Sequence, residues 1–335
     1  MTRKIVQISN SSRQAKYRQI INSILNAVAT GRLSRGDKVP SINDIANEFG
    51  LSRDTVMLAF NELKARGVIM SVPGIGYFIE STNVQFDQKI FLLFDEFSSF
   101  KEILYNSFIS ALEGKGQVDI YFHHFNLSVF EALIKDNAAR YTTYVILPGN
   151  LQNIGNTINV LPQDKIIILD QLSDETKGKY SAVYQSFQDD IYHCLETGLE
   201  KLRKYNKFIL AYPGGKEPIG FVEGFQKFCC NFGLDFDVVP YLTDPLINKG
   251  EAYIMPKDSD LVTVVKKAQH EGWQLGKDIG VISINETPLK EVVANGITTI
   301  STDFDLMGKT LAKMVLENIR QEIKNPARLI VRGSL

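Results

Sequence analysis

Cysteine and histidine are scarce in this chain, which excludes the sites that depend on them. Its 335 residues include three cysteines and four histidines. An odd number of cysteines, with Cys229 and Cys230 adjacent, argues against a disulfide framework and fits a reducing compartment. The histidines have no metal-ligand spacing with the cysteines. We therefore predict no metal site and no cofactor.

Long apolar runs are also missing. No run reaches the roughly 18 residues that a membrane-spanning helix needs, and the N-terminal residues MTRKIVQISN lack the apolar core of a secretory signal. The hydrophobic content of 44% is that of an ordinary globular protein, and 335 residues suffice for two domains with their own cores. We expect a cytoplasmic protein with no membrane partner.

Sequence signatures of catalysis are absent or incomplete. PGGK at residues 213–216 has part of a phosphate loop, but Glu217 follows the lysine and the GxxxxGK[ST] spacing is missing. No GxSxG motif supports a nucleophilic serine. The paired acids Asp189 and Asp190 stand at the start of an apparent helix, where the helix dipole accounts for them. We predict that the chain is not an enzyme.

Acidic residues are scarce in the first quarter of the chain. The net charge of −1 hides an excess of Lys and Arg in residues 1–82, where 11 basic residues face 6 acidic ones, against 26 and 32 in the remainder. A basic end attracts phosphates. A surplus of this size indicates nucleic-acid binding only together with a binding motif in the same residues.

What is present in residues 17–79 is a run of three helices followed by a hairpin. A helical stripe begins at Tyr17 and ends at Val28. Ser41 is placed to cap a second helix, with Asp44 three residues on and Gly50 at its end. Ser52 is placed to cap a third helix, which we expect to reach Arg66. In that third helix Val56, Ala59, Phe60 and Leu63 share the inward arc.

The outward arc of the third helix collects Arg53, Asp54, Met57, Asn61 and Lys64. Ser52 and Thr55 lie at its start, where backbone N–H groups favour a phosphate. Any amphipathic three-helix unit also shows polar residues outside. The hairpin favours the functional interpretation, because Gly74 and Gly76 suit a tight tip that can approach DNA.

These residues resemble the DNA-binding domain of GntR-type bacterial regulators. The resemblance runs through Gly31, Gly36-Asp37, Val39-Pro40-Ser41, Gly50-Leu51-Ser52-Arg53, Thr55-Val56, Gly67 and Gly74-x-Gly76-Tyr77-Phe78. It implies a winged helix-turn-helix that binds double-stranded operator DNA, with Arg53 reading a base. Family members often carry arginine where this chain has Asn43 and Met57, so we expect Asn43 to address adenine and Met57 a thymine methyl. The implied DNA-binding residues are Ser41, Asn43, Ser52, Arg53, Asp54, Thr55, Met57, Gly74 and Gly76.

A polar stretch at residues 81–88 is predicted to be a linker. The pattern of apolar residues changes after it. Short apolar runs such as KIFLLFD, KIIIL and IGVISI alternate with helical stretches near 99–115, 127–141, 219–232 and 258–272. Such alternation is typical of a parallel sheet covered by helices. Ligands of these sheets bind at the carboxyl ends of the strands.

The order of these stretches resembles the effector-binding domain of LacI-type repressors, which is related to periplasmic sugar-binding proteins. The segments that carry it are 207–234, 275–286 and 297–319, with LIVRGSL as a closing strand. The implied fold is α/β: a winged helix-turn-helix at 1–80 precedes a two-lobed, periplasmic-binding-protein-like domain at 89–335. We expect lobe one at about 89–186 and 286–326, and lobe two at about 187–285 and 327–335.

The resemblance implies a small-molecule effector, a carbohydrate, bound between the lobes and controlling operator affinity. Where the family often has arginine and aspartate in the cleft, this chain has Phe221 and Asn285. A sensor of a nucleotide, peptide or protein partner is the alternative, and an enzyme fusion is a further one. The resemblance also implies a homodimer, for which a helix from Asp303 to Lys324 offers an interface. The implied effector-binding residues are Glu96, Phe97, Lys101, Phe187, Phe221, Lys257, Asp258 and Asn285.

Overall fold

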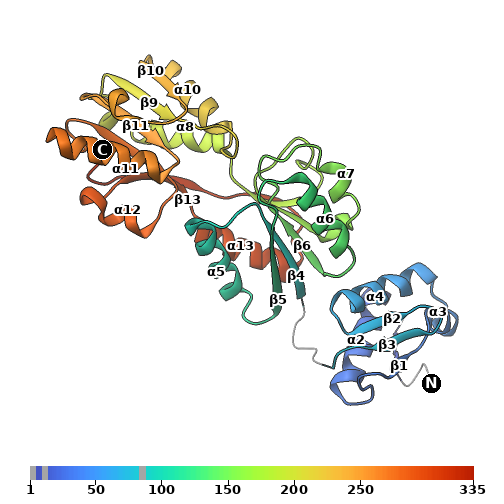
Figure 1. The fold of residues 1–335 in the computed structure, drawn as a ribbon. Coiled ribbons are helices and arrows are strands. Elements are labelled where there is room, and N and C mark those ends of the chain that lie inside the picture. Colours follow the sequence, from blue (N-terminus) through green and yellow to red (C-terminus); the bar gives the residue numbers. More distant parts are fainter. Residues whose placement is uncertain (1–4, 10–13, 83–87) are drawn as a thin grey trace.

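A computed structural model describes residues 5–9, 14–82 and 88–335 of the chain. Figure 1 shows an N-terminal domain and two α/β lobes, with strands β4–β6 in the lobe nearer to the N-terminal domain and β9–β11 in the other. Of the expected linker, residues 83–87 lie outside the described residues. No helix within the described ranges is long and apolar enough to cross a membrane.

The N-terminal domain packs three helices against a small antiparallel sheet of order β1-β3-β2. Its core is apolar, and Ile20, Ile24, Val56, Phe60 and Leu63 are fully buried there. Burial of these side chains accounts for the helical spacing seen in the sequence. The elements are α2 (Lys16–Ala29), β1 (Lys38–Val39), α3 (Ile42–Phe49), α4 (Arg53–Ala65), β2 (Ile69–Val72) and β3 (Gly76–Ile79).

Lobe one contains a sheet of order β14-β8-β7-β6-β4-β5, and all of its strand pairs are parallel. Its strands are apolar because helices cover the sheet on both faces, leaving clusters of buried side chains on each side. Its elements are β4 (Gln88–Phe94), α5 (Ser99–Ala111), β5 (Gly116–Phe122), α6 (Leu127–Asn137), β6 (Thr143–Ile146), α7 (Gly155–Ile158), η1 (Gln163–Lys165), β7 (Ile166–Asp170), β8 (Ser181–Tyr184), α13 (Phe304–Glu317) and β14 (Glu322–Lys324).

Lobe two contains a sheet of order β10-β9-β11-β12-β13-β15, parallel except for the β13–β15 pair. Its elements are α8 (Phe187–Thr197), α9 (Leu199–Leu202), β9 (Lys207–Ala211), α10 (Gly220–Phe232), β10 (Phe236–Val239), η2 (Asp244–Leu246), β11 (Glu251–Met255), α11 (Asp258–Glu271), β12 (Gly280–Ile284), α12 (Pro288–Val292), η3 (Val293–Asn295), β13 (Thr298–Thr302) and β15 (Ala327–Ile330). Cys194 and Cys229 are buried in this lobe, whereas Cys230 is exposed.

The chain crosses between the lobes after β8, between β13 and α13, and between β14 and β15. Asn325 joins the three crossings. Its backbone N–H donates to the carbonyl of Tyr184 at 2.7 Å, and its side-chain amide donates to Thr302 Oγ1 at 2.8 Å and to the carbonyl of Asp303 at 2.9 Å. The lobes are therefore connected by adjacent, hydrogen-bonded segments rather than by separate tethers.

Two expectations about this region were wrong. Residues 286–302, assigned to lobe one, contribute α12 and β13 to lobe two, because β13 pairs with β12 and β15 there. The expected helix from Asp303 to Lys324 ends at Glu317. Asn318 follows in the left-handed conformation at φ 56°, which asparagine tolerates, and residues 322–324 then form β14 beside β8.

Candidate functional site

The N-terminus of α4 presents polar side chains to solvent. Ser52 caps this helix, and its Oγ accepts a hydrogen bond from the N–H of Thr55 at 3.2 Å and lies 2.8 Å from Thr55 Oγ1. Arg53, at the first helical position, is exposed, as is Asp54. Leu58 is exposed on this helix as well. We call the outward arc predicted from the sequence, Arg53, Asp54, Met57, Asn61 and Lys64, the α4 surface; all five are exposed.

Helix α3 begins with a capping box. Ser41 Oγ accepts from the N–H of Asp44 at 3.1 Å, while the Asp44 carboxylate accepts from the N–H of Ser41 at 3.0 Å. These bonds lower the pKa of Asp44. Gly50 ends the helix in the left-handed conformation at φ 62°, so the turn into α4 is tight. Asn43 is exposed on the first turn of α3.

The β2–β3 hairpin forms a wing beyond the helices. Gly74 and Gly76 both have positive φ, at 74° and 133°, and a side chain at Gly76 would approach Lys38 Cε at 3.1 Å. Ile75 stands between them and is 58% exposed. The tip therefore offers backbone and one apolar side chain rather than a charged group.

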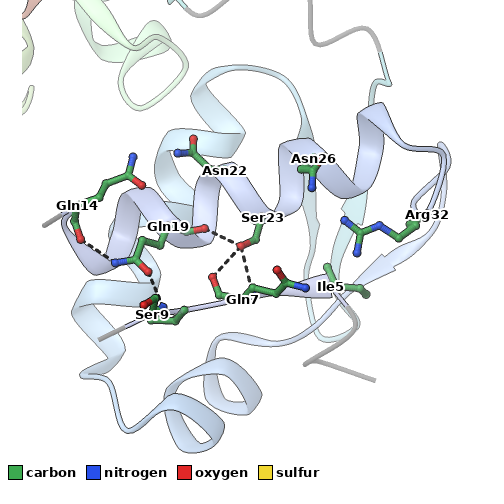
Figure 2. A pocket seen from close by; sticks show the side chains of 10 residues that line it. Ile5, Gln7, Ser9, Gln14, Gln19, Asn22, Ser23, Asn26 and Arg32 are labelled. Atoms are coloured by element: carbon green, nitrogen blue, oxygen red, sulfur yellow. Dashed lines mark hydrogen bonds between the residues drawn. The ribbon is translucent and has the colours of Figure 1, made fainter. Parts of the chain in front are cut away.

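A groove of about 510 Å³ lies along α2, away from the α4 surface. Figure 2 shows that amide and hydroxyl groups of α2 bond to the N-terminal segment beside it. Ser23 Oγ is within 3.0 Å of both the N–H and the carbonyl of Gln7, and Gln19 Oε1 accepts from the N–H of Ser9 at 2.8 Å. These hydrogen bonds hold the segment of residues 5–9 against α2.

A cavity of about 90 Å³ lies between the two lobes. Of the residues expected there, Glu96, Lys101, Phe187, Phe221 and Asn285 line it. They come from both lobes: Glu96 follows β4, Lys101 lies on α5, and Phe187, Phe221 and Asn285 lie at the start of α8, in the first turn of α10 and after β12. We call this space the interlobe cavity.

Three expected residues do not line the interlobe cavity. Phe97 is 62% exposed and packs its ring against Phe122, at a centroid distance of 6.4 Å. Asp258 instead forms an ion pair with Lys290, with 3.2 Å between Oδ1 and Nζ. Lys257 is the N-cap residue of α11, with an extended backbone, and it lies outside the residues that line the cavity.

The structure adds residues that the sequence analysis did not name. Most of them follow strands or lie in loops, whereas Phe100 lies on α5. Applying the strand-end rule to β5, β6, β7 and β8 would have found several of them. Gly149 follows β6, Asp170 ends β7, and Gln185 follows β8. The full added set is Asp95, Phe100, Phe125, Gly149, Asp170, Gln171, Gln185, Lys216, Glu217 and Pro218.

The carboxylates of the cavity differ in their partners. Asp95 forms an ion pair with Lys101, and both side chains are largely buried. Glu96 forms an ion pair with Lys216 from the other lobe. Asp170 accepts a hydrogen bond from the Gln185 amide. Burial raises the pKa of Asp170, and it also raises the pKa of Glu217.

Unusual backbone conformations gather around the same cavity. Phe125, Asp170 and Asn285 have φ of 56°, 74° and 63°, a region that non-glycine residues rarely adopt. Such residues persist only where the surrounding structure holds them, and they cluster at functional sites. For Asn285 the holding group is Lys290, whose Nζ donates to the Asn285 carbonyl at 2.8 Å and to that of Ile284 at 3.0 Å.

Comparison with protein families assigns two parts of the chain. Residues 16–79 match the family of bacterial regulatory proteins named gntR. Residues 206–335 match the periplasmic binding protein-like domain. The first match covers α2 to β3 and thus the whole α4 surface and wing; the second covers most of lobe two.

Individual relatives match mainly through the N-terminal part. The mannosyl-D-glycerate transport/metabolism system repressor MngR of Escherichia coli (strain K12) is 35% identical over 80 residues, which are 24% of this chain and 33% of that protein. The arabinose metabolism transcriptional repressor of Geobacillus stearothermophilus is 38% identical over 64 residues, 19% of this chain and 18% of that protein. The chain thus spans a third or less of the length of these relatives.

Solved structures share the fold over most of the chain. A dimeric Lac repressor with an 11-residue C-terminal deletion has a TM-score of 0.63 at 16% identity, covering 73% of this chain and 98% of that one. A LacI family regulator from Enterococcus faecium with bound ribose has a TM-score of 0.59 at 16% identity, covering 73% and 98%. This chain therefore joins a GntR-family winged helix-turn-helix domain to a two-lobed α/β domain with the periplasmic-binding-protein-like fold found in LacI-type regulators.

Proposed function

We propose that the protein is a transcriptional regulator whose affinity for operator DNA is controlled by a small molecule held between the lobes. The observation that carries the proposal is the presence, on one chain, of an exposed helix N-terminus in a winged helix-turn-helix and a cavity lined by polar groups from both lobes. The first suits a DNA groove. The second suits a small ligand that is sensed and not transformed.

The DNA-binding role rests on the α4 surface. Arg53 projects from the first turn, where its guanidinium can donate two hydrogen bonds to a guanine. The free N–H groups of that turn, together with Ser52 and Thr55, face the region a phosphate would occupy. Asn43 on α3 and Met57 on α4 would contact neighbouring bases, and Gly74 and Gly76 would let the wing approach the backbone of the duplex.

The sensing role rests on the position of the cavity at the strand ends of both sheets. A ligand there touches both lobes and so favours one arrangement of the crossing segments around Asn325. A ligand shifts such an equilibrium only by its differential affinity for the two arrangements. The effector of this proposal is a sugar or sugar derivative. The names of the relatives above, which mention mannosyl-D-glycerate and arabinose, and the ribose in one solved structure support that class.

The proposal is tested by pairing ligand binding with operator binding. An operator is selected in vitro with the full chain, and sugars and sugar phosphates are screened by thermal shift. A ligand at about 100 times its Kd stabilises the protein by roughly 2.7 kcal/mol. We expect a stabilising sugar also to change operator affinity by about fivefold or more, measured by fluorescence anisotropy.

Two glutamine variants provide a matched control for that experiment. Gln171→Ala removes a side chain that lines the interlobe cavity, and Gln274→Ala removes an exposed one from the loop before β12. Only the first should weaken the effect of the sugar on DNA binding. Thermal stabilisation by nucleotides or peptides with silence across sugars would instead favour the alternative effector class.

A homodimer is part of the proposal, because two copies can read the two halves of a palindromic operator. Helix α12 supports it: Leu289 and Val292 are 73% and 74% exposed and lie within one turn of each other. Apolar side chains exposed to this degree side by side are typical of an interface. The comparison with a dimeric Lac repressor supports the same assembly.

The double variant Leu289→Asp/Val292→Asp is expected to convert the dimer to a monomer in sedimentation velocity experiments. Two carboxylates at a desolvated interface would lose their hydration without gaining a partner. Val262→Asp on α11, where the native side chain is 49% exposed, serves as the control and should leave the dimer intact. A double variant that sediments as the parent does would exclude α12 from the interface.

A further inference from the structure

The charges that line the interlobe cavity do not balance. Four carboxylates line it, and two ammonium groups, those of Lys101 and Lys216, do so as well; the described lining residues include no arginine. Lys101 is committed to Asp95, and Lys216 is committed to Glu96. Each ammonium group therefore already has a carboxylate as its ion-pair partner.

Asp170 and Glu217 are the two carboxylates left over. Within the described part of the chain neither forms an ion pair, and the Asp170 carboxylate has only the neutral Gln185 amide as a side-chain partner. They come from opposite lobes, Asp170 from the end of β7 and Glu217 from the loop before α10. Lysine charges act on both groups: Lys257, Lys101 and Lys216 on Glu217, and Lys101 on Asp170. Burial outweighs these charges and raises the pKa of both carboxyl groups, so a ligand that brings further positive charge would stabilise their ionised form.

The cavity already holds an ammonium group supplied by the chain itself. Lys216 reaches from lobe two to lobe one, where its Nζ lies 4.8 Å from the centre of the Phe125 ring and pairs with Glu96. The loop that carries it is held across the cleft by Asn150, whose amide donates to the carbonyl of Gly215 at 2.8 Å and to that of Glu217 at 3.1 Å. A carboxylate beside an aromatic face is a favourable setting for an ammonium ion.

From this imbalance we infer that the effector carries a primary ammonium group, as an amino sugar or a glycosylated amine does, and that Asp170 and Glu217 are the residues that select it. This inference rests on the proposed sensing role of the interlobe cavity. Burial disfavours the charged form of both carboxyl groups and so raises the pKa of each. A neutral sugar can hydrogen-bond to them in either form, whereas an ammonium group binds the ionised carboxylates most strongly and stabilises that form. Both residues line the interlobe cavity, one from each lobe, so an ammonium group bound there adds positive charge where the two lobes meet.

Lys216 has a defined part in this arrangement. Its ammonium group adds positive charge to the cavity and pairs with Glu96 of the other lobe, so it opposes the entry of a second cation. Replacing Lys216 with methionine keeps an unbranched side chain over Phe125 and removes the competing charge. We expect Lys216→Met to bind an amine more tightly than the parent does, and a neutral sugar no more tightly.

The test compares amino sugars with their neutral parents on the full chain. Glucosamine and glucose, galactosamine and galactose, and mannosamine and mannose are titrated by isothermal calorimetry at neutral pH. We expect the amine of at least one pair to bind about tenfold or more tightly than its parent, the size expected for a charge-assisted contact in a partly buried site. In Asp170→Asn/Glu217→Gln that preference should fall to about threefold or less.

The double variant Asp170→Asn/Glu217→Gln keeps the shape of both side chains while removing their charge. Asparagine tolerates the positive φ of Asp170, and the amide can still bond to Gln185. Equal affinity for amines and parents, a preference that survives in the double variant, or no binding of any amine would each overturn the inference.

The same samples are assayed for operator binding. If a neutral sugar alters operator affinity, the proposed regulator stands while the inferred ammonium fails; if amines bind without altering operator affinity, the regulator fails instead.

Discussion

Replacing Arg53 with alanine is expected to weaken operator binding by roughly 10- to 100-fold, because a bidentate arginine–guanine contact contributes about 1–3 kcal/mol of discrimination. The side chain is exposed at the first position of α4. Its removal therefore leaves the buried core of the domain unchanged. Affinity is measured by fluorescence anisotropy on the selected operator, and thermal stability is measured on the same sample to establish that the fold is intact.

Specificity should change along with affinity. Loss of a base contact relaxes discrimination at one base pair, whereas loss of a phosphate contact weakens all sequences alike. Arg328→Ala removes an equal charge from an exposed position on β15 of lobe two and serves as the control for net charge. If the two variants bind the operator equally well, Arg53 makes no base contact and the assignment of the α4 surface is wrong.

Substituting Gly224 with alanine is expected to lower the free energy of unfolding by about 1–3 kcal/mol or more, the cost of overpacking a closely packed contact. In most helix interiors the same change stabilises, because alanine has the higher helix propensity. At Gly224 the expected effect on stability has the opposite sign. A Cβ at Gly224 would lie 2.2 Å from the backbone oxygen of Gln188 on α8, and backbone cannot move aside as a flexible side chain can.

This variant also bears on sensing, because α8 and α10 carry Phe187 and Phe221 at their N-terminal ends, where they line the interlobe cavity. Their rings meet edge to face at 5.3 Å between centroids. Forcing the helices apart should therefore weaken effector binding as well. Glu223→Ala on the exposed side of α10 is the control, and urea unfolding followed by circular dichroism measures both. A stability equal to that of the parent would mean that the helices repack without cost.

The helices and exposed faces of the N-terminal domain could be predicted from the sequence in the most detail. Its signals are local: the capping box at Ser41 and Asp44, the left-handed Gly50, and the alternation of buried and exposed positions along α4 all follow from residues within a few positions of one another. Helix caps and helical periodicity depend on short-range hydrogen bonds and on one face being buried. The residues of the α4 surface could therefore be placed from the sequence.

The interlobe cavity was only partly open to prediction. Glu96, Lys101, Phe187, Phe221 and Asn285 were named because they lie at or near strand ends and match a family pattern. Asp170 and Glu217, the two carboxylates without an ion-pair partner, were not named as site residues. Glu217 was considered only as the residue that breaks a phosphate-loop motif. Its place in the same cavity as Asp170 depends on how the two lobes meet, which no local pattern encodes.

The sequence by itself determined the alternation of strands and helices from residue 89 on, the inward and outward faces of α4, and the end of α3 at Gly50, since each depends on neighbouring residues. Tertiary structure alone decided the lobe to which residues 286–302 belong, the end of the last long helix at Asn318, and the meeting of Lys216 with Glu96. The physical reason is the same in each case: strand pairing and lobe contacts join residues far apart in the chain, so their outcome is set by competition among long-range partners.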